Sequence, residues 1–245
     1  MLQQRKSAGE HRKTLYNCEK CQDRGWIIVP RERAQPLFIK CECQEAKKVK
    51  GEWKNSGIRT DMCNYTFKNY EVWNESSNSA KRTATAYFLK FKGIKDTRQN
   101  SIMFCGQVGS GKTHLAVALA LNLIEEGFKV VYMPYRDEIT KIKQSMKDID
   151  SYRRIVDKYK LCEVLLIDDL FKGRVNESDI NIMFEVINYR YLNCLPMIIS
   201  SEFTLERLLE FDEGVGSRIY EMCRSYIVEI PKKLENNYRL KGEER

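Results

Sequence analysis

Short apolar runs alternate along most of this chain with longer segments in which apolar residues recur every three or four positions. A short apolar run is typical of a strand buried on both faces of a parallel sheet, whereas the longer spacing is typical of a helix with one apolar face. Strands are predicted at residues 101–105, 129–133, 163–169, 196–201 and 226–230, and helices at 79–92, 114–126, 135–160 (as one or two helices), 176–193 and 216–222, with Thr204 capping a further short helix. This alternation predicts an α/β fold in which helices flank a parallel sheet.

A glycine-rich segment joins the first of these strands to its helix. Residues 106–113 read GQVGSGKT and fit the phosphate-binding loop pattern GxxxxGK[ST] in the strand–loop–helix context that the pattern requires. Glycines let backbone N–H groups turn inward around phosphates, and the helix N-terminus adds partial positive charge. Lys112 would reach the β- and γ-phosphates and the Thr113 hydroxyl would hold Mg²⁺. The predicted nucleotide-binding residues are Gly106, Gln107, Val108, Gly109, Ser110, Gly111, Lys112, Thr113 and His114; the alternative is a chance glycine-rich turn.

Two acids end the apolar strand at residues 163–169. Ligands of parallel sheets bind at the carboxyl ends of the strands, beside the phosphate loop. Asp168 is therefore predicted to hold Mg²⁺, and Asp169 to orient the attacking water. The alternative for these two acids is that they simply begin a turn. The polar tip of the next strand, Ser200 and Ser201, would sense hydrolysis of the γ-phosphate.

Nine cysteines are present, and four of them form two close pairs near the N-terminus. Cys18-x-x-Cys21 is separated from Cys41-x-Cys43 by 19 residues, and the first pair is followed by a turn and the apolar run WIIV at 26–29. Two such pairs predict a closed, structural zinc site of four thiolates in a zinc-ribbon-like module, with unligated thiols as the alternative. A module this small would depend on its metal to fold.

The length of 245 residues accommodates a medium domain with a small module, and three parts are predicted. They are an N-terminal zinc module at 1–54, a connecting segment at 55–78 and a nucleotide-binding domain at 79–245. The aromatic residues of the connecting segment are expected to pack on the domain, with base stacking by Tyr65 or Phe67 as the alternative.

Charge is concentrated at the N-terminus. Residues 1–60 contain 14 Lys and Arg against 7 Asp and Glu, whereas the whole chain has a net charge of +8. This favours an acidic partner such as nucleic acid or an acidic protein face, or else a solvated basic surface. The chain has no apolar run of about 18 residues and no apolar core of a secretory signal, so we expect a cytoplasmic protein without a membrane partner.

Three sequence features resemble the AAA+ ATPases of the bacterial replicative helicase-loader group, the DnaC/DnaI type and their phage relatives. The features are NSGIR at 55–59 with the aromatic segment up to Tyr70, the phosphate loop with VLLIDDL at 164–170, and GSRIYEM at 216–222 with NYRL at 237–240. The resemblance covers about residues 55–240, and the cysteine pairs are similar to those of zinc-bearing members. It implies an AAA+ P-loop NTPase core with ATP and Mg²⁺ as cofactors.

The resemblance also implies roles for particular residues. Arg218 matches the arginine finger, which acts on ATP bound by a neighbouring subunit, so self-association through ATP-dependent interfaces is expected. Arg239 resembles the second sensor. The chain departs from the family at the first sensor, because Glu202 follows Ser201 and would add repulsive charge near the γ-phosphate. Asp169 replaces a commoner glutamate, which implies slow hydrolysis.

The implied function is an ATP-dependent loader that binds single-stranded DNA, holds a hexameric replicative helicase through the N-terminal module, and releases it on hydrolysis. Candidate DNA contacts are Lys141, Lys143, Lys147, Lys172 and Arg174. One alternative is an IstB-type transposition helper ATPase acting on duplex DNA; another is a non-hydrolysing zinc adaptor in which ATP only sets the conformation. A metabolic P-loop kinase fits less well, because no acceptor-substrate site is visible.

Overall fold

A computed structural model describes residues 18, 20–22, 24–31, 35–41, 51 and 54–241. The chain divides into two compact units, Met1–Gly51 and Glu52–Arg245, and each is described by itself.

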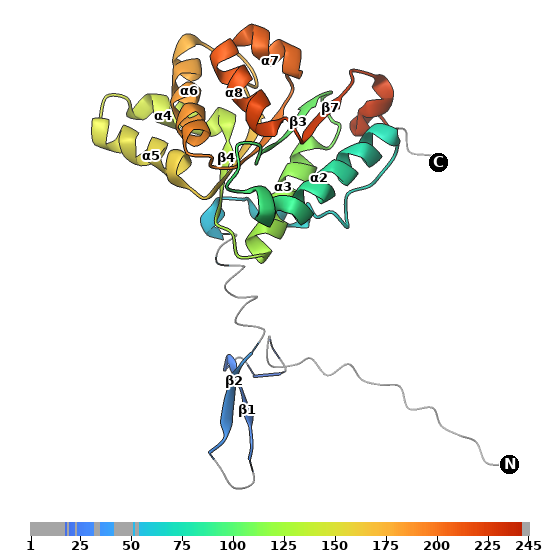
Figure 1. The fold of residues 1–245 in the computed structure, drawn as a ribbon, viewed down its shortest axis with the longest axis vertical. Coiled ribbons are helices and arrows are strands. Elements are labelled where there is room, and N and C mark those ends of the chain that lie inside the picture. The colour runs from blue at the N-terminus through green and yellow to red at the C-terminus, as the bar shows by residue number, and fades with distance from the viewer. Residues whose placement is uncertain are drawn as a thin grey trace, which may run out of the picture. The chain divides into compact units, whose positions relative to one another are not determined.

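The first unit contains a two-stranded antiparallel hairpin, β1 (Trp26–Val29) and β2 (Leu37–Lys40), drawn in blue in Figure 1. The register pairs Trp26 with Lys40 and Val29 with Leu37. Nearly every strand residue is exposed, whereas Cys21 and Cys41 beside the hairpin are buried. Among the described residues of this unit, the buried positions are thus Cys21, Gly25 and Cys41, at the open end of the hairpin.

The second unit is built on a five-stranded sheet. Its strands are β3 (Ile102–Gly106), β4 (Val130–Pro134), β5 (Val164–Leu170), β6 (Met197–Ser201) and β7 (Ile227–Ile230). They lie in the order β4-β5-β6-β3-β7, and every neighbouring pair is parallel. The predicted α/β fold with a parallel sheet is confirmed, and β3, which carries the glycine-rich loop, has a strand on each side.

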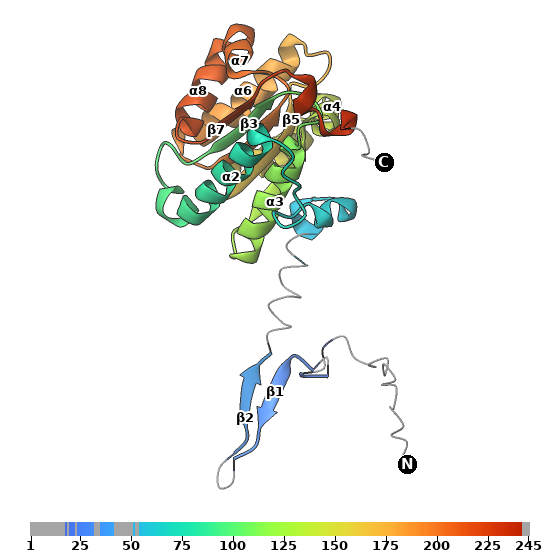
Figure 2. The same ribbon diagram turned by 90° about the vertical axis from the view of Figure 1, so that its right-hand side faces the viewer.

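Helices cover both faces of this sheet, as Figures 1 and 2 show. They are α2 (Glu75–Ile94), α3 (Lys112–Glu125), α4 (Tyr135–Ser145), α5 (Ile149–Leu161), α6 (Glu177–Leu192), α7 (Leu205–Phe211) and α8 (Glu213–Cys223), with short 3₁₀ turns at Thr60–Asn64, Leu234–Asn236 and Tyr238–Leu240. Helix α3 packs across β3, β4, β5 and β6 on one face, beside α2. On the other face α4, α5, α6 and α8 share a buried core with alternate strand residues, including Met103, Leu165 and Ile199.

Capping explains where the observed helices differ from the predicted ones. Helix α2 begins at Glu75 rather than at residue 79, because Asn74 accepts from the Ser77 amide and Ser77 accepts from the Asn74 amide. The polar run after Trp73 therefore forms the N-cap and first turn of α2. The segment predicted at 135–160 is two helices, of which the second is capped by Asp148, and Thr204 caps α7 as predicted.

Candidate nucleotide-binding site

The loop between β3 and α3 has a backbone that requires glycine. Gly109 and Gly111 have left-handed φ angles of 71° and 81°. A Cβ at Gly109 would overlap the side-chain oxygen of Asn237, and a Cβ at Gly111 would lie 2.8 Å from a ring carbon of Tyr70. Because other residues disfavour both the angle and the space, the loop can only take this shape with glycine at these positions.

Lys112 is the first residue of α3 and is buried. Its ammonium donates to the carbonyl oxygens of Gly106 at 3.0 Å and Gln107 at 2.5 Å. Burial lowers the pKa of Lys112, and nearby Glu202 and Asp169 oppose that shift. The carbonyl groups of the loop thus hold the ammonium beside the position at which a phosphate is expected to bind.

Asp168 is buried at the end of β5 and accepts three hydroxyl hydrogen bonds. Thr113 Oγ1 (2.9 Å) and Ser200 Oγ (2.5 Å) donate to its Oδ1, and the Tyr132 hydroxyl donates to its Oδ2 at 3.1 Å. Burial raises the pKa of Asp168, although the hydroxyl groups oppose the shift. The structure therefore brings together a carboxylate and a hydroxyl, oxygen donors that suit Mg²⁺.

The next acid, Asp169, takes part in an ion-paired cluster. Lys172 Nζ lies 2.8 Å from Asp169 Oδ2 and 3.1 Å from Glu202 Oε1. Lys172 was expected on a DNA-binding surface, but it faces this cavity instead. Of the predicted sensor residues, Ser200 binds Asp168 and accepts from the Asp169 amide, while Ser201 binds the Leu170 carbonyl. The cavity is lined by Glu202 and not by these serines.

The phosphate loop and the ion-paired cluster line a cavity of about 330 Å³. Val108 to His114, Asp169, Lys172 and Glu202 form one part of its lining, and the other part comes from Tyr65, Asn69, Tyr70, Glu71, Trp73, Tyr238 and Arg239. The Tyr65 ring stacks on His114 with centroids 4.8 Å apart, and a His114 ring nitrogen lies 2.9 Å from the Thr66 carbonyl oxygen. Burial lowers the pKa of His114. Tyr65 thus both packs on the domain and borders the cavity, whereas Phe67 does not line it.

Two segments far apart in the sequence close this aromatic part of the cavity. Tyr238 N donates to the Gly109 carbonyl at 2.9 Å, and the Trp73 and Asn74 side chains donate to the Glu235 carbonyl at 3.1 and 2.9 Å. Arg239, the residue that resembles the second sensor, is thereby placed at the cavity. The C-terminal turns therefore connect the connecting segment to the phosphate loop.

The predicted arginine finger lies elsewhere. Arg218 Nε donates to Asn188 Oδ1 at 2.9 Å, and its Nη1 donates to the Gly214 carbonyl at 2.7 Å. Its guanidinium lies 4.9 Å from the ring centroid of Phe184. The structure therefore places Arg218 between α8 and α6, outside the cavity of its own chain.

The basic residues of α4 are only partly available for DNA. Lys141 pairs with Glu138 and Lys143 with the buried Asp179, each at 2.6 Å. The two remaining candidates, Lys147 and Arg174, lie outside α4 and are exposed, so both are accessible to DNA.

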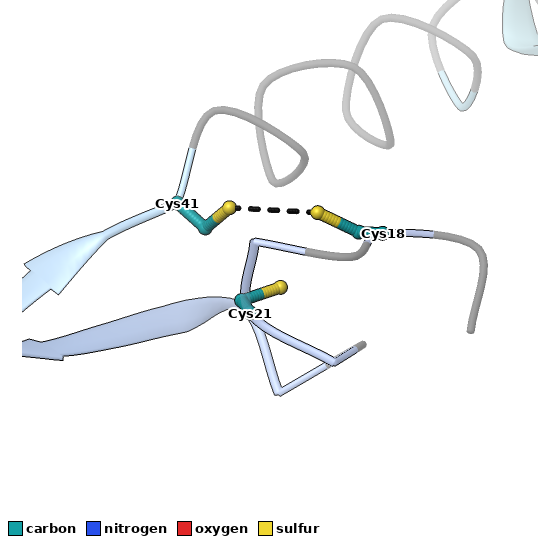
Figure 3. A group of neighbouring side chains, drawn as sticks. All are labelled: Cys18, Cys21 and Cys41. Carbon is teal, nitrogen blue, oxygen red and sulfur yellow. Dashed lines mark hydrogen bonds between the residues drawn. The ribbon is translucent and has the colours of Figure 1, made fainter. Parts of the chain in front are cut away.

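Three cysteines of the first unit face one another (Figure 3). The Sγ atoms of Cys18, Cys21 and Cys41 all lie within 4.8 Å, those of Cys18 and Cys41 are 3.7 Å apart, and the Gly25 amide donates to Cys21 Sγ. Tetrahedral zinc with Zn–S bonds of about 2.3 Å separates its sulfur ligands by about 3.8 Å, so the three thiols fit this metal. Cys43 lies outside the described residues.

Comparison with known proteins places this site in a family. The family profile described as IstB-like ATP binding protein matches residues 48–217. The chain belongs to the IstB-like ATP-binding proteins. The phage-like element PBSX protein XkdC of Bacillus subtilis (strain 168) is 36% identical to this IstB-like chain over 236 residues, which are 93% of the chain and 87% of XkdC.

Helicase loaders are also similar to this IstB-like chain. The replicative helicase loader DnaC of Escherichia coli (strain K12) is 24% identical over 180 residues, covering 73% of the chain and 71% of DnaC. A crystal structure of the DnaC helicase loader matches with a TM-score of 0.60 and 26% identity, covering 70% of this chain and 99% of that one. The predicted AAA+ P-loop core and the predicted resemblance to the loader group are confirmed, and this IstB-like protein is an ATP-binding AAA+ ATPase.

Sequence patterns missed several residues of the IstB-like site. Tyr132, Lys172 and Asn237 reach it from elements that are not adjacent to the phosphate loop in sequence. The position of Tyr132 near the carboxyl end of a parallel strand is a usable signal. Asn237 opens the NYRL segment that carries part of the family resemblance, but that segment gave no indication of a contact with Gly109. In the part of the chain that the structure describes, no helix is both long and apolar enough to cross a bilayer.

Proposed function

We propose that this protein is an ATP-dependent loader of a replicative DNA helicase, which holds the helicase and single-stranded DNA and releases the helicase on ATP hydrolysis. One observation carries the proposal: the ATPase unit matches the solved DnaC helicase loader over 99% of that chain, and in this unit the phosphate loop lies beside Asp169 at the cavity, with Thr113 of the loop donating to the buried Asp168. Fold alone does not specify function, so the loader role rests on this combination.

In this proposal each residue of the cavity has a defined task in hydrolysis. Lys112 and the loop amides hold the phosphates, and Thr113 with Asp168 would hold Mg²⁺, which neutralises developing phosphate charge when bound. Ser200 and Tyr132 keep the Asp168 carboxylate oriented through their 2.5 and 3.1 Å hydrogen bonds. Asp169 orients the attacking water, and its short side chain is a reason to expect slow, partner-regulated turnover.

Two arginines complete the ATP site of an assembly. Arg239 borders the cavity of its own chain and would contact the phosphates there. Arg218 lies outside that cavity, which suits a residue that acts on the ATP of a neighbouring subunit. Its contacts with Asn188 and Gly214 would hold the guanidinium until such a neighbour binds.

The first unit would bind the helicase. Cys18, Cys21 and Cys41, with Cys43 as the fourth ligand, would hold a structural zinc ion that fixes the ends of the hairpin. The exposed apolar strands then present Trp26 and Phe38 to a protein partner.

Single-stranded DNA would contact exposed cations of the ATPase unit. Lys147 and Arg174 are the better candidates, because Lys141 and Lys143 are paired with acids. Neutralising phosphates releases counterions, so binding should weaken as salt rises. Charge reversal at Lys147 should weaken DNA binding more than the same change at Lys141, whose charge Glu138 already compensates.

The experiment that tests the proposal is co-purification with a hexameric replicative helicase in ATP and in ADP. We expect a complex in ATP that dissociates as phosphate is released, and that persists when Asp169→Asn prevents hydrolysis. A chain that hydrolyses ATP but captures no helicase in either nucleotide would contradict the loader role.

The family match favours a second function, a helper ATPase of transposition acting on duplex DNA with a transposase. Strong preference for duplex over single-stranded DNA, together with no helicase binding, would establish that reading in place of the first. The zinc-fitting cysteine cluster favours the loader.

A further inference from the structure

One end of the cavity holds a three-membered charge bridge. Lys172 contacts Asp169 at 2.8 Å and Glu202 at 3.1 Å, and all three side chains are about one-third exposed towards the cavity. Two carboxylates thus share one ammonium at one end of the cavity that we propose as the binding site of the ATP triphosphate.

The local fold fixes this lysine. Asp169 and Phe171 have left-handed φ angles of 58° and 59°, and the Lys172 amide donates to the Asp169 carbonyl. Non-glycine residues keep such angles only when the surroundings enforce them. Here packing of the Phe171 side chain holds the turn in this conformation. The ring is fully buried, and its centroid lies 5.0 Å from that of Phe211 and 5.7 Å from that of Tyr135. The turn therefore presents Lys172 to the cavity in one position.

The bridge is near Lys112, the residue of the phosphate loop that would reach the terminal phosphates. The carboxylates of Glu202 and Asp169 raise the pKa of Lys112 and the ammonium of Lys172 lowers it, so all four charges interact at this end. Burial lowers the pKa of Lys172 itself, but its bonds to Asp169 and Glu202 outweigh burial and raise it. Without Lys172, Glu202 would face the incoming phosphates as an unpaired anion.

We propose that Lys172 is a positioning residue that neutralises Glu202, so that the cavity accepts the terminal phosphate of ATP. This inference rests on the cavity being the ATP site. It explains how a glutamate is tolerated at a position where the sequence alone indicates repulsion. Lys172 acts through Glu202 rather than as the group that binds the phosphate, and that distinction defines the test.

The test is a double-mutant cycle in the full-length, zinc-loaded chain, with Mg·ATP and Mg·ADP affinities measured by calorimetry. Lys172→Met should weaken Mg·ATP binding about 10- to 100-fold, because a unit charge near the phosphates is left unpaired. The loss for Mg·ADP should be smaller, since ADP lacks the third phosphate. Lys172→Met/Glu202→Gln should recover part of the ATP affinity, because Asp169 still lacks its lysine in the double variant, whereas Glu202→Gln alone should change the affinity less than threefold.

Two controls separate this role from folding. Lys172→Arg should retain ATP affinity, and Lys160→Met removes a lysine that pairs with Glu185 at 3.0 Å outside the cavity, so it should not change ATP affinity. If the double variant binds ATP no better than Lys172→Met, Lys172 contacts the phosphate directly and the proposal is overturned. Unchanged ATP binding by Lys172→Met overturns it too. Absence of ATP binding by the wild-type chain would instead refute the site itself, which distinguishes the two failures.

Discussion

The hairpin β1–β2 and the sheet strands β5 and β6 are both short β-structures, but they are stabilised differently. Trp26 is 50% exposed and Phe38 59% exposed, whereas all residues of β6 and nearly all of β5 are buried. An isolated two-stranded hairpin is marginal in water, while a sheet between helix layers gains the free energy of apolar burial. The contrast teaches that apolar burial stabilises the second unit, whereas the exposed hairpin of the first unit gains little from burial, so a metal held by Cys18, Cys21 and Cys41 is expected to stabilise it.

Metal removal should produce the largest difference between the two units. Structural zinc contributes about 10–16 kcal/mol of binding free energy in small zinc modules, so chelation should unfold the hairpin completely. The thermal midpoint of the ATPase unit should stay within a few degrees. Loss of hairpin amide signals in NMR spectra, with zinc release measured in parallel, checks this prediction.

A matched pair of variants sharpens the zinc prediction. Cys18→Ser should release zinc, whereas Cys194→Ser changes a thiol of the ATPase unit and should retain it. A zinc-free chain whose hairpin remains folded would break the comparison.

Arg190 should give the largest effect within the second unit. Its side chain is fully buried, and its guanidinium donates to the carbonyls of Tyr159, Cys162 and Pro196 at 2.8–2.9 Å. Arg190→Met removes the guanidinium from these buried carbonyls, of which Pro196 keeps a bond from the Leu165 amide and Tyr159 one from the Cys162 thiol, so the free energy of unfolding should fall by about 3–5 kcal/mol. Urea unfolding measures this, with the exposed Arg224→Met as a control within about 0.5 kcal/mol. Equal effects of the two variants would contradict the structure.

Asp168→Asn should change stability less and in the opposite direction. Burial raises the pKa of Asp168 in the folded chain, so ionisation at pH 7 costs stability. The variant should therefore be more stable at pH 7, and the gain should disappear as the pH falls below the raised pKa towards the unfolded value near 4. Mg·ATP affinity should fall at the same time. A variant that is less stable than wild type at pH 7 would show that the carboxylate is instead stabilised by its three hydroxyl partners.

Tyr70→Phe should have the smallest effect. The Tyr70 ring is buried against the phosphate loop, and its hydroxyl has no hydrogen-bond partner among the described residues. Removing it should alter the free energy of unfolding of the nucleotide-free chain by no more than about 0.5 kcal/mol. Thermal unfolding without nucleotide checks this; a loss above 1 kcal/mol would reveal a bond to this hydroxyl.

The sheet could be predicted from sequence because buried parallel strands are continuous apolar runs, as at 164–167 and 197–199. The phosphate loop and the position of Asp168 followed from local pattern and from the rule for strand ends. The start of α2 was missed because the Asn74–Ser77 capping box reads as a polar linker.

The rest of the site depends on contacts that sequence spacing does not encode. The sequence predicts that Glu202 repels the γ-phosphate and that Lys172 contacts DNA. Their ion pair is not predicted, because the two residues are 30 positions apart in the sequence. The aromatic part of the cavity depends on the hydrogen bond from the Trp73 indole to the Glu235 carbonyl. No periodic sequence pattern relates these two residues, so this contact could not be predicted. Contacts between residues that are distant in the sequence, rather than sequence motifs, therefore fix the positions of these side chains.

Calorimetric titration of Mg·ATP into the wild-type chain and into Lys112→Ala tests most directly whether a triphosphate lodges between Lys112 and the Asp168–Asp169 edge. One site per chain is predicted for wild type. The variant should lose at least about 100-fold in affinity while the unfolding temperature of its nucleotide-free form stays close to that of wild type. Equal affinity in the two proteins, or no binding to wild type, would contradict the assignment of this cavity as the ATP site.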